Sequence, residues 1–258
     1  MMEFGHPLNT LTGHELGVIS LAVSKQAEYI FSSSFDGTLR KWDLKNNTTP
    51  TIIELENSYQ PWMLDINGGD EVLLCGRDNG KLDLFGTQTN KLMRTLDSDA
   101  KFLLSAKFSP NGKLIGCGAE NGIVTIFDVE TGEYFAKFEA HAMGIRSLCF
   151  SQDSLLLLTT SEDGQVRLFD YHHSDTPINT ISAHKSWVLT SAFHPSAPIF
   201  ATGSSDKSVK VWDIRNFENL HFFDSHKDQV CDICFDPLGQ QLVSVSDDQS
   251  ICFYRLDN

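Results

Sequence analysis

The stretch Ser204-Ser-Asp-Lys-Ser-Val-Lys-Val-Trp-Asp213 decides the fold, because its pattern returns at a fixed distance along the chain. An aromatic residue occupies the position of Trp212 every 42 or 43 residues, and an Asp or Asn precedes each one by six. The aromatic column holds Trp42, Phe85, Phe127, Phe169, Trp212 and Tyr254, and the turn column holds Asp36, Asn79, Asn121, Asp163, Asp206 and Asp248. A third column, 28 residues before the aromatic, holds His14, Asn57, Asp99, His141, His184 and His226. Three columns at one period establish an internal repeat.

Each copy of the repeat contains short apolar runs that are separated by turns. Residues 145–150, 155–160 and 165–170 are three such runs within one copy. Runs of this length, bounded by turn residues, predict β-strands rather than helices. Asx-Gly pairs such as Asp163-Gly164 supply the positive φ angles of tight hairpins. The sequence therefore predicts an all-β protein with about four strands per repeat.

A unit of about 40 to 45 residues with a His and a Trp-Asp pair resembles a WD-repeat blade, whose copies stack radially into a β-propeller. We predict six recognisable four-stranded blades that form one domain over residues 1–258. The resemblance implies a buried chain of hydrogen bonds from histidine through serine and aspartate to the indole in a complete blade. Two copies carry the whole set, namely His14, Ser34, Asp36 and Trp42, and His184, Ser204, Asp206 and Trp212. The two copies without the histidine are expected to depend more on apolar packing.

Composition excludes several classes of function. The net charge of -14 comes without any basic run, which argues against direct nucleic-acid binding and favours a basic partner. The chain has neither a run of about 18 apolar residues nor a basic, apolar leader, so we expect an intracellular protein without a membrane span. Cys231-x-x-Cys234 has the spacing of a metal knuckle, but we expect a strand with reduced, buried thiols, and neither metal nor cofactor.

The same histidine, serine and aspartate types occur in hydrolase triads. They recur at equal offsets in four copies, for example as His14, Ser34 and Asp36. A catalytic site needs one such constellation beside an oxyanion hole rather than one per repeat. We therefore predict a non-catalytic protein.

A propeller brings the residue before each turn aspartate, and the residues that begin each first strand, to the mouth of its central channel. Four of the six residues that precede the turn are acidic. Large aromatic side chains fall at neighbouring positions, and carboxylates with aromatic faces are what an arginine side chain binds. We predict a peptide-binding rim, although Trp62 or Trp187 could instead pack between blades. The rim consists of Phe35, Trp62, Asp78, Phe102, Glu120, Arg146, Glu162, Trp187 and Asp247.

Particular segments resemble the WD-repeat subunits of the superkiller (Ski) complex, a family that in animals is shared with the RNA polymerase II associated factor (Paf) complex. They are residues 11–18, 100–105, 122–129, 141–148, 186–189, 204–213 and 243–249. The resemblance implies a scaffold subunit in the cytoplasm and nucleus that assists exosome-mediated 3'-5' mRNA decay, with a second role in transcription elongation. Its implied partner is a tetratricopeptide-repeat protein with arginine-containing motifs that also holds an RNA helicase. An adaptor of a ubiquitin ligase or a reader of basic histone tails would use a similar rim.

The number of repeats departs from that family, which is seven-bladed, because a first blade is missing from the six copies found here. Residues 8–11 then correspond to an outer strand whose own blade is absent. This strand could close a six-bladed ring beside residues 251–254, or the ring could have an open edge. Unpaired strand edges promote aggregation, so we expect closure.

Overall fold

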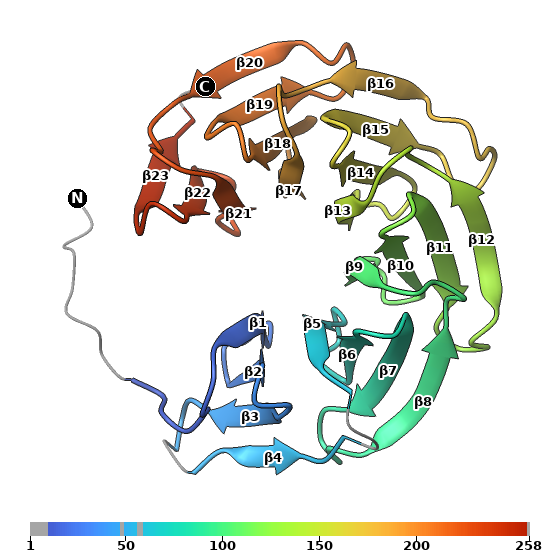
Figure 1. Ribbon diagram of the computed structural model, residues 1–258, viewed down its shortest axis with the longest axis vertical. Helices are drawn as coiled ribbons and strands as arrows, with labels where there is room; N and C mark the ends of the chain where they lie inside the picture. The colour runs from blue at the N-terminus through green and yellow to red at the C-terminus, as the bar shows by residue number, and fades with distance from the viewer. Residues whose placement is uncertain (1–9, 47–48, 56–58, 257–258) are drawn as a thin grey trace.

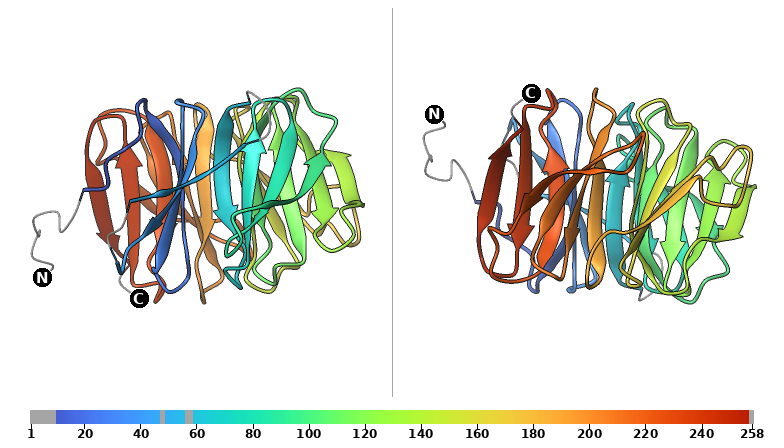
Figure 2. Two further views of the ribbon diagram at one scale, coloured as in Figure 1. Left: turned by 90° about the horizontal axis from the view of Figure 1, so that it is seen from below. Right: turned by 90° about the horizontal axis from the view of Figure 1, so that it is seen from above.

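The computed structural model describes residues 10–46, 49–55 and 59–256. These residues form an all-β propeller with six sheets, or blades, arranged around a centre, and Figure 1 looks down that centre. Five sheets have four antiparallel strands, and the sixth has three strands within the described residues. Seen from the side, the blades form a disc about as thick as one strand is long (Figure 2).

The strands follow one another from the centre of each blade to its outside. The first three blades contain β1 (Val18–Val23), β2 (Tyr29–Ser34), β3 (Leu39–Asp43) and β4 (Thr51–Ile53); β5 (Pro61–Ile66), β6 (Val72–Arg77), β7 (Lys81–Gly86) and β8 (Leu92–Asp97); and β9 (Leu103–Phe108), β10 (Leu114–Ala119), β11 (Ile123–Asp128) and β12 (Tyr134–Glu139). The last three contain β13 (Ile145–Phe150), β14 (Leu157–Ser161), β15 (Gln165–Phe169) and β16 (Asn179–Ser182); β17 (Val188–Phe193), β18 (Ile199–Ser204), β19 (Val209–Asp213) and β20 (Asn219–Phe223); and β21 (Val230–Phe235), β22 (Gln241–Ser246) and β23 (Ile251–Arg255).

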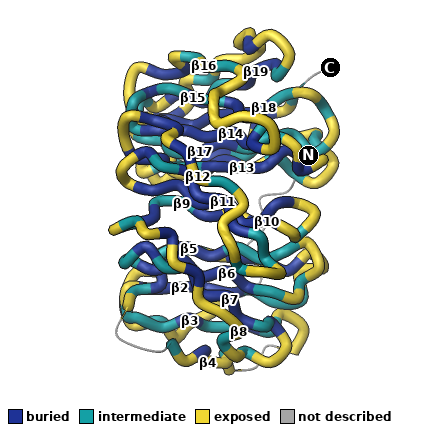
Figure 3. The backbone as a smooth tube through the Cα atoms, turned by 90° about the vertical axis from the view of Figure 1, so that its right-hand side faces the viewer, coloured by how far each residue is buried: buried dark blue, intermediate teal, exposed yellow. Residues whose placement is uncertain are grey.

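Burial explains the sequence pattern of each strand. Every residue of β10 and β14 is buried, because a neighbouring blade covers each face of these strands. The outer strands β8 and β12 are mostly exposed (Figure 3). A strand that is covered on both faces has a continuous apolar or small-residue run, whereas an outer strand alternates.

The turn between the second and third strands positions the aspartate column. In the third blade, Gly122 follows the column residue Asn121 and has φ 80°. A β-carbon on Gly122 would lie 2.0 Å from the carbonyl oxygen of His141. Glycine is therefore required at this position for space as well as for conformation. Lys207 fills the equivalent position of the fifth blade with φ 76°.

The ring is open between the first and last blades. The first strands of successive blades pack together from β1 through β5, β9, β13 and β17 to β21, but β1 and β21 form no comparable contact. Figure 1 shows this break between the sheet β1–β4 and the sheet β21–β23. The expectation of closure was wrong for the described residues, because none of their strands fills the space between the first and last blades. Leu8 and Asn9 of the predicted closing strand lie outside the described residues, and Thr10 and Leu11 belong to no strand.

Candidate interaction site

The predicted hydrogen-bond chain exists in the two complete blades, but its hydroxyl comes from a different residue. In the fifth blade, Nε1 of Trp212 donates to Oγ1 of Thr202 at 2.9 Å, and that oxygen lies 2.8 Å from Nε2 of His184. Nδ1 of His184 lies 3.1 Å from a carboxylate oxygen of Asp206. A neutral imidazole with its proton on Nδ1 satisfies every member of this chain.

The first blade repeats this geometry with Ser32 between His14 and Trp42. Oγ of Ser32 lies 2.7 Å from both Nε2 of His14 and Nε1 of Trp42. Nδ1 of His14 lies 2.9 Å from Asp36. We name this set of histidine, hydroxyl, aspartate and aromatic ring the polar link.

The serines predicted for this role, Ser34 and Ser204, were wrongly assigned. Oγ of Ser204 donates to the carbonyl oxygen of Trp187 at 2.8 Å and accepts the backbone N–H of Asp206 at 3.0 Å. Ser34 makes the same pair of bonds with Leu16 and Asp36. Ser34 and Ser204 are the last residues of β2 and β18, and at this end of the strand their hydroxyls lie too far from the indole to bond to it. Their hydrogen bonds shape the turn instead.

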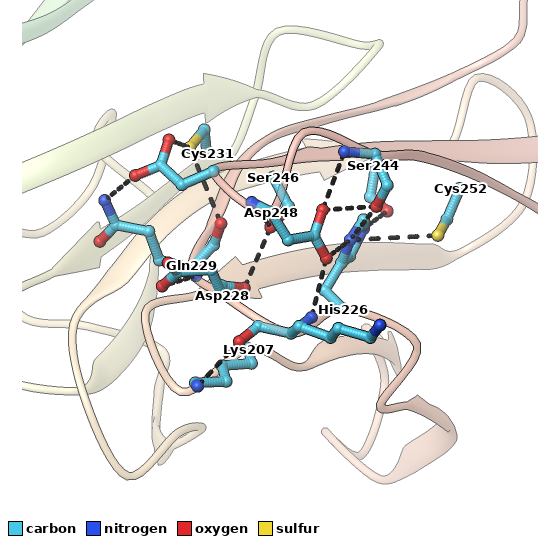
Figure 4. Close-up of polar contacts among 12 residues, drawn as sticks. Lys207, His226, Asp228, Gln229, Cys231, Ser244, Ser246, Asp248 and Cys252 are labelled. Carbon is cyan, nitrogen blue, oxygen red and sulfur yellow. Dashed lines mark hydrogen bonds and ion pairs between the residues drawn. The ribbon is translucent and has the colours of Figure 1, made fainter.

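The fourth and sixth blades show how the polar link tolerates another aromatic ring. His226 lies between Asp248 at 3.1 Å and Ser244 at 2.6 Å, as Figure 4 shows. Oγ of Ser244 donates to the hydroxyl oxygen of Tyr254 at 3.3 Å, so the tyrosine takes the place of the indole as the last member of the polar link. In the fourth blade His141 lies between Asp163 and Thr159, while Phe169 donates nothing.

One further column identifies the true hydroxyl and could have been found in the sequence. Ten residues before each aromatic residue, the chain has a hydroxyl or thiol: Ser32, Cys75, Cys117, Thr159, Thr202 and Ser244. The cysteines stand in the two blades that lack the histidine. Burial raises the pKa of Cys117 to about 12, so this thiol is a weak, neutral donor.

The second blade contains a polar contact that the sequence did not predict. Arg77 and Asp83 form a buried ion pair, and Oγ1 of Thr95 donates to the other carboxylate oxygen of Asp83 at 2.7 Å. The guanidinium also lies over the ring of Tyr59. Apolar packing alone therefore does not hold this blade, because it has an ionic substitute for the polar link.

Three predicted rim residues form an aromatic row across the first three blades. The ring centroids of Phe35 and Trp62 lie 6.1 Å apart, and those of Trp62 and Phe102 lie 5.2 Å apart. Phe35 is 48% exposed, whereas Trp62 is half-buried and also packs on the core between its blade and the next. Trp62 thus takes part both in the rim and in the packing between blades.

Three other rim residues form a group in which one cation is already bound. Nε of Arg146 donates to Oε1 of Glu162 at 2.7 Å, and the guanidinium carbon lies 5.0 Å from the ring centroid of Trp187. Trp187 is 43% exposed. The chain thereby shows, with its own arginine, that this carboxylate and this ring fit a guanidinium group.

Of the remaining acidic residues of the rim, Glu120 lies beside Glu162, whereas Asp247 and Asp78 lie on other blades. A β-carbon on Gly144 would lie 3.3 Å from the carboxyl carbon of Glu162 and 3.4 Å from the backbone oxygen of Glu120, so the two glutamates are neighbours. Asp247 lies on the last blade, where Gln229 and Cys231 hydrogen-bond to its carboxylate. Oδ1 of Asp78 is buried and unpaired among the described residues. Because of the break, the rim is an arc, and Phe35 and Asp247 lie at opposite ends of it.

No group of three or more potential metal ligands exists among residues 10–46, 49–55 and 59–256. Cys231 and Cys234 are exposed and free, which corrects the expectation that they are buried. Partial desolvation of the sulfur, together with the neighbouring Asp247 carboxylate, raises the pKa of Cys231 to about 12. The described residues also contain no helix that is long and apolar enough to cross a membrane.

Comparison with known proteins agrees with this geometry. The pattern described as "WD domain, G-beta repeat" matches residues 5–43, 90–128, 132–170, 175–213 and 217–255, which is more than half of the chain. Residues 44–89, which contain β4 to β7, are not matched.

Several curated relatives share parts of the chain. "Superkiller complex protein 8" of Dictyostelium discoideum is 36% identical over 84 residues, or 32% of this chain and 28% of the relative. "WD repeat-containing protein VIP3" of Arabidopsis thaliana is 34% identical over 120 residues, or 41% of this chain and 37% of the relative. Seven curated relatives, these two among them, are aligned to the chain over less than two fifths of their own length.

A longer alignment exists with "WD repeat-containing protein SL1-17" of Schistosoma mansoni. It is 31% identical over 286 positions, which cover 94% of this chain and 80% of the relative. With the matched repeats, the period of 42 or 43 residues and the six radial sheets, the chain belongs to the WD-repeat family of β-propeller proteins.

Proposed function

We propose that this protein is a non-catalytic interaction scaffold that binds an arginine-containing peptide segment of a partner on its rim. The observation that carries the proposal is the contact of Arg146 with Glu162 and Trp187. A guanidinium that pairs with a carboxylate and stacks on an indole is a strong recognition element in proteins. The aromatic row of Phe35, Trp62 and Phe102 would hold apolar residues of the same peptide.

The charge of the molecule supports a basic partner. The chain has a net charge of -14, and Glu120 and Asp247 are exposed on the rim. Complementary charge raises the rate of association and excludes acidic competitors. The repeated histidine, hydroxyl and aspartate residues do not favour an enzyme, because the polar link uses them to join strands within each blade.

We further propose that the partner is a tetratricopeptide-repeat protein of a Ski-type assembly that assists mRNA decay with an RNA helicase. The partial similarity to "Superkiller complex protein 8" supports this identity. A role in transcription elongation and residence in both cytoplasm and nucleus belong to the same proposal. A pull-down of the tagged chain from its native cells tests the partner. Recovery of a helicase and a tetratricopeptide-repeat protein is expected, whereas cullin-ligase components or histones would identify an adaptor or a histone reader instead.

The rim itself is tested with a fluorescent peptide that contains two arginines, titrated against purified protein. Trp187→Ala and Glu162→Lys should each weaken binding by more than about tenfold, or about 1.4 kcal/mol. Matched controls lie away from the rim: Phe222→Ala on the outer strand β20, and Glu130→Lys just after β11. These controls should retain the affinity of the natural sequence. Equal affinity in all five proteins would remove the rim as the binding surface.

A further inference from the structure

The fourth blade shows how the rim of this chain holds a guanidinium group. Arg146 is the second residue of β13, and Glu162 directly follows β14. Nε of Arg146 donates to Oε1 of Glu162, and the ring of Trp187 covers the guanidinium. An acid, a cation and an aromatic ring thus form a complete set, in which the charge of the acid is balanced within the chain.

The second blade has the corresponding acid and ring positions, but the chain supplies no cation there. Trp62 is the second residue of β5, and Asp78 directly follows β6. These strands pair in the same register as β13 and β14, with a bulge after the first pair in both blades. In the last blade, which has this register too, the corresponding Cys231 and Asp247 are in contact at 3.0 Å. Trp62 and Asp78 therefore occupy neighbouring positions.

The carboxylate of Asp78 is not balanced by the chain. Asp78 is half-buried, and its Oδ1 atom is buried without a hydrogen-bond partner in the part of the chain that the structure describes. Arg77, the preceding residue, is already held by Asp83 and lies over the ring of Tyr59. A buried carboxylate oxygen without a donor raises the free energy of the folded state. A positively charged donor at this position would remove that cost.

The indole of Trp62 belongs to the aromatic row, so three rings are present where the fourth blade has one. The ring of Trp62 crosses that of Phe35 at 67° and that of Phe102 at 73°. Phe35 is 48% exposed. Rings that cross present faces in more than one direction, and ring faces attract cations. The row therefore provides an aromatic wall beside the acid.

This combination of groups favours a guanidinium over other organic cations. The Asp78 carboxylate needs an N–H donor, which a trimethylated ammonium lacks. A lysine ammonium has donors, but it is strongly hydrated and must lose water on aromatic rings. A guanidinium is planar and weakly hydrated, stacks on rings and carries five N–H donors. Arginine is thus the side chain that satisfies both the acid and the rings.

We propose that Asp78 and the aromatic row form a second arginine subsite of the rim. The guanidinium pairs with Asp78, and the methylene stem lies on the row beside the apolar residues of the same segment. The inference rests on the proposed function and makes it more specific, because the bound segment then carries two arginines. One binds on the second blade and the other on the fourth.

The test follows the indole N–H signals of the full chain, labelled with 15N-tryptophan, by nuclear magnetic resonance. The probe is N-acetyl-arginine-N-methylamide. Trp62 reports the second blade and Trp187 the fourth, while the buried Trp42 and Trp212 report the fold. The Trp62 signal should shift saturably. The uncharged citrulline analogue should give no saturable shift, and the lysine analogue should bind at least about threefold more weakly.

Asp78→Asn keeps the size of the side chain and removes its charge. It should weaken the titration of the Trp62 signal at least about fivefold and leave the titration of the Trp187 signal unchanged. The matched control is Glu130→Gln, which removes the same charge from an exposed residue just after β11 and should leave both titrations unchanged. Signals of Trp42 and Trp212 at their natural positions confirm that each variant is folded.

Two results would overturn the subsite. The Trp62 signal could stay in place while that of Trp187 shifts, which would leave the proposed function intact and put the arginine on the fourth blade alone. Alternatively, Asp78→Asn could bind the probe as well as Glu130→Gln does. A shift of Trp62 without one of Trp187 would support the subsite and contradict the fourth-blade site of the proposed function. The absence of a saturable shift in both signals would contradict both.

Discussion

Thr202 contributes to stability more than its size suggests, because its hydroxyl joins His184 to Trp212. Thr202→Val keeps the shape but leaves an imidazole nitrogen and an indole N–H buried without partners. A buried polar group without a hydrogen bond costs about 1 to 3 kcal/mol. We expect the free energy of unfolding, measured by guanidinium titration, to fall by about that amount. Thr202→Ser retains the hydroxyl and should lose much less, and equal stability of the two variants would refute the role of Thr202.

The polar links also make stability depend on pH. Burial lowers the pKa of His184, and although burial alone would raise the pKa of Asp206, hydrogen bonds from His184 and Ser208 hold it well below its ordinary range. The pKa of Asp36 is likewise low, because bonds from Thr38, Glu15 and His14 outweigh its burial. The unfolded chain therefore takes up more protons than the folded chain as the pH falls below the ordinary values of about 6.5 for histidine and about 4 for aspartate.

We expect stability to be greatest near neutral pH and to fall in two stages on acidification. The first stage lies below about pH 6.5 and reflects His184, and the second lies below about pH 4 and reflects the aspartates. Unfolding titrations at several pH values measure both stages. His184→Gln should lose the part of the first stage that belongs to this histidine. Stability that rises between pH 7 and pH 5 would contradict the assignment.

The effect of replacing Arg146 on peptide binding distinguishes two interpretations of the rim. If the peptide's arginine binds Glu162 and Trp187, then Arg146 competes with it, and Arg146→Ala should tighten binding by about fivefold. The measurement is the same peptide titration, with Arg94→Ala as the matched control, because Arg94 lies on β8 away from the rim. Weaker binding by Arg146→Ala would show instead that the partner presents an acid to this residue.

At the scale of the element, the blades that bury a polar centre do not all use the same residues. Four blades use a histidine and an aspartate, whereas the second uses Arg77, Asp83 and Thr95. A buried pair is costly to break from one side, because the remaining charge has no partner. The sequence predicted which blades lack the histidine, but it did not predict the substitute, since Arg77 and Asp83 meet only when two strands pair.

We expect Asp83→Leu to destabilise the protein by about 3 to 5 kcal/mol, because it leaves Arg77 charged and buried. The double variant Arg77→Met/Asp83→Leu should recover most of this loss. Thermal and chemical unfolding of the two single variants and the double variant give the coupling energy. Equal losses in the single and double variants would show that the ion pair is not the stabilising contact.

At the scale of the whole molecule, the charge of -14 acts over the entire rim rather than through one contact. Surface charges interact over a Debye length of about 8 Å at physiological salt, and this distance shrinks as salt is added. We expect the arginine peptide to bind at least about fivefold more weakly at 0.5 M than at 0.05 M sodium chloride, mainly through slower association. Stopped-flow fluorescence measures the rate, and a peptide with glutamine in place of arginine serves as the control. An affinity independent of salt would indicate apolar recognition by the aromatic row.

The sequence by itself determined the repeat, the strands and the turns, because these depend on local periodicity and on residues at fixed offsets. Trp212, Asp206 and His184 could be aligned with their counterparts by counting alone. The hydroxyl column at Thr202 was also present in the sequence, but nearby serines such as Ser204 concealed it. Only the tertiary structure decided that Arg146 contacts Glu162 and Trp187, and that Arg77 pairs with Asp83. It also decided that the ring of the described residues stays open, with Val18 and Phe253 exposed, because contact between the first and last blades depends on residues far apart in the sequence, which no single repeat encodes.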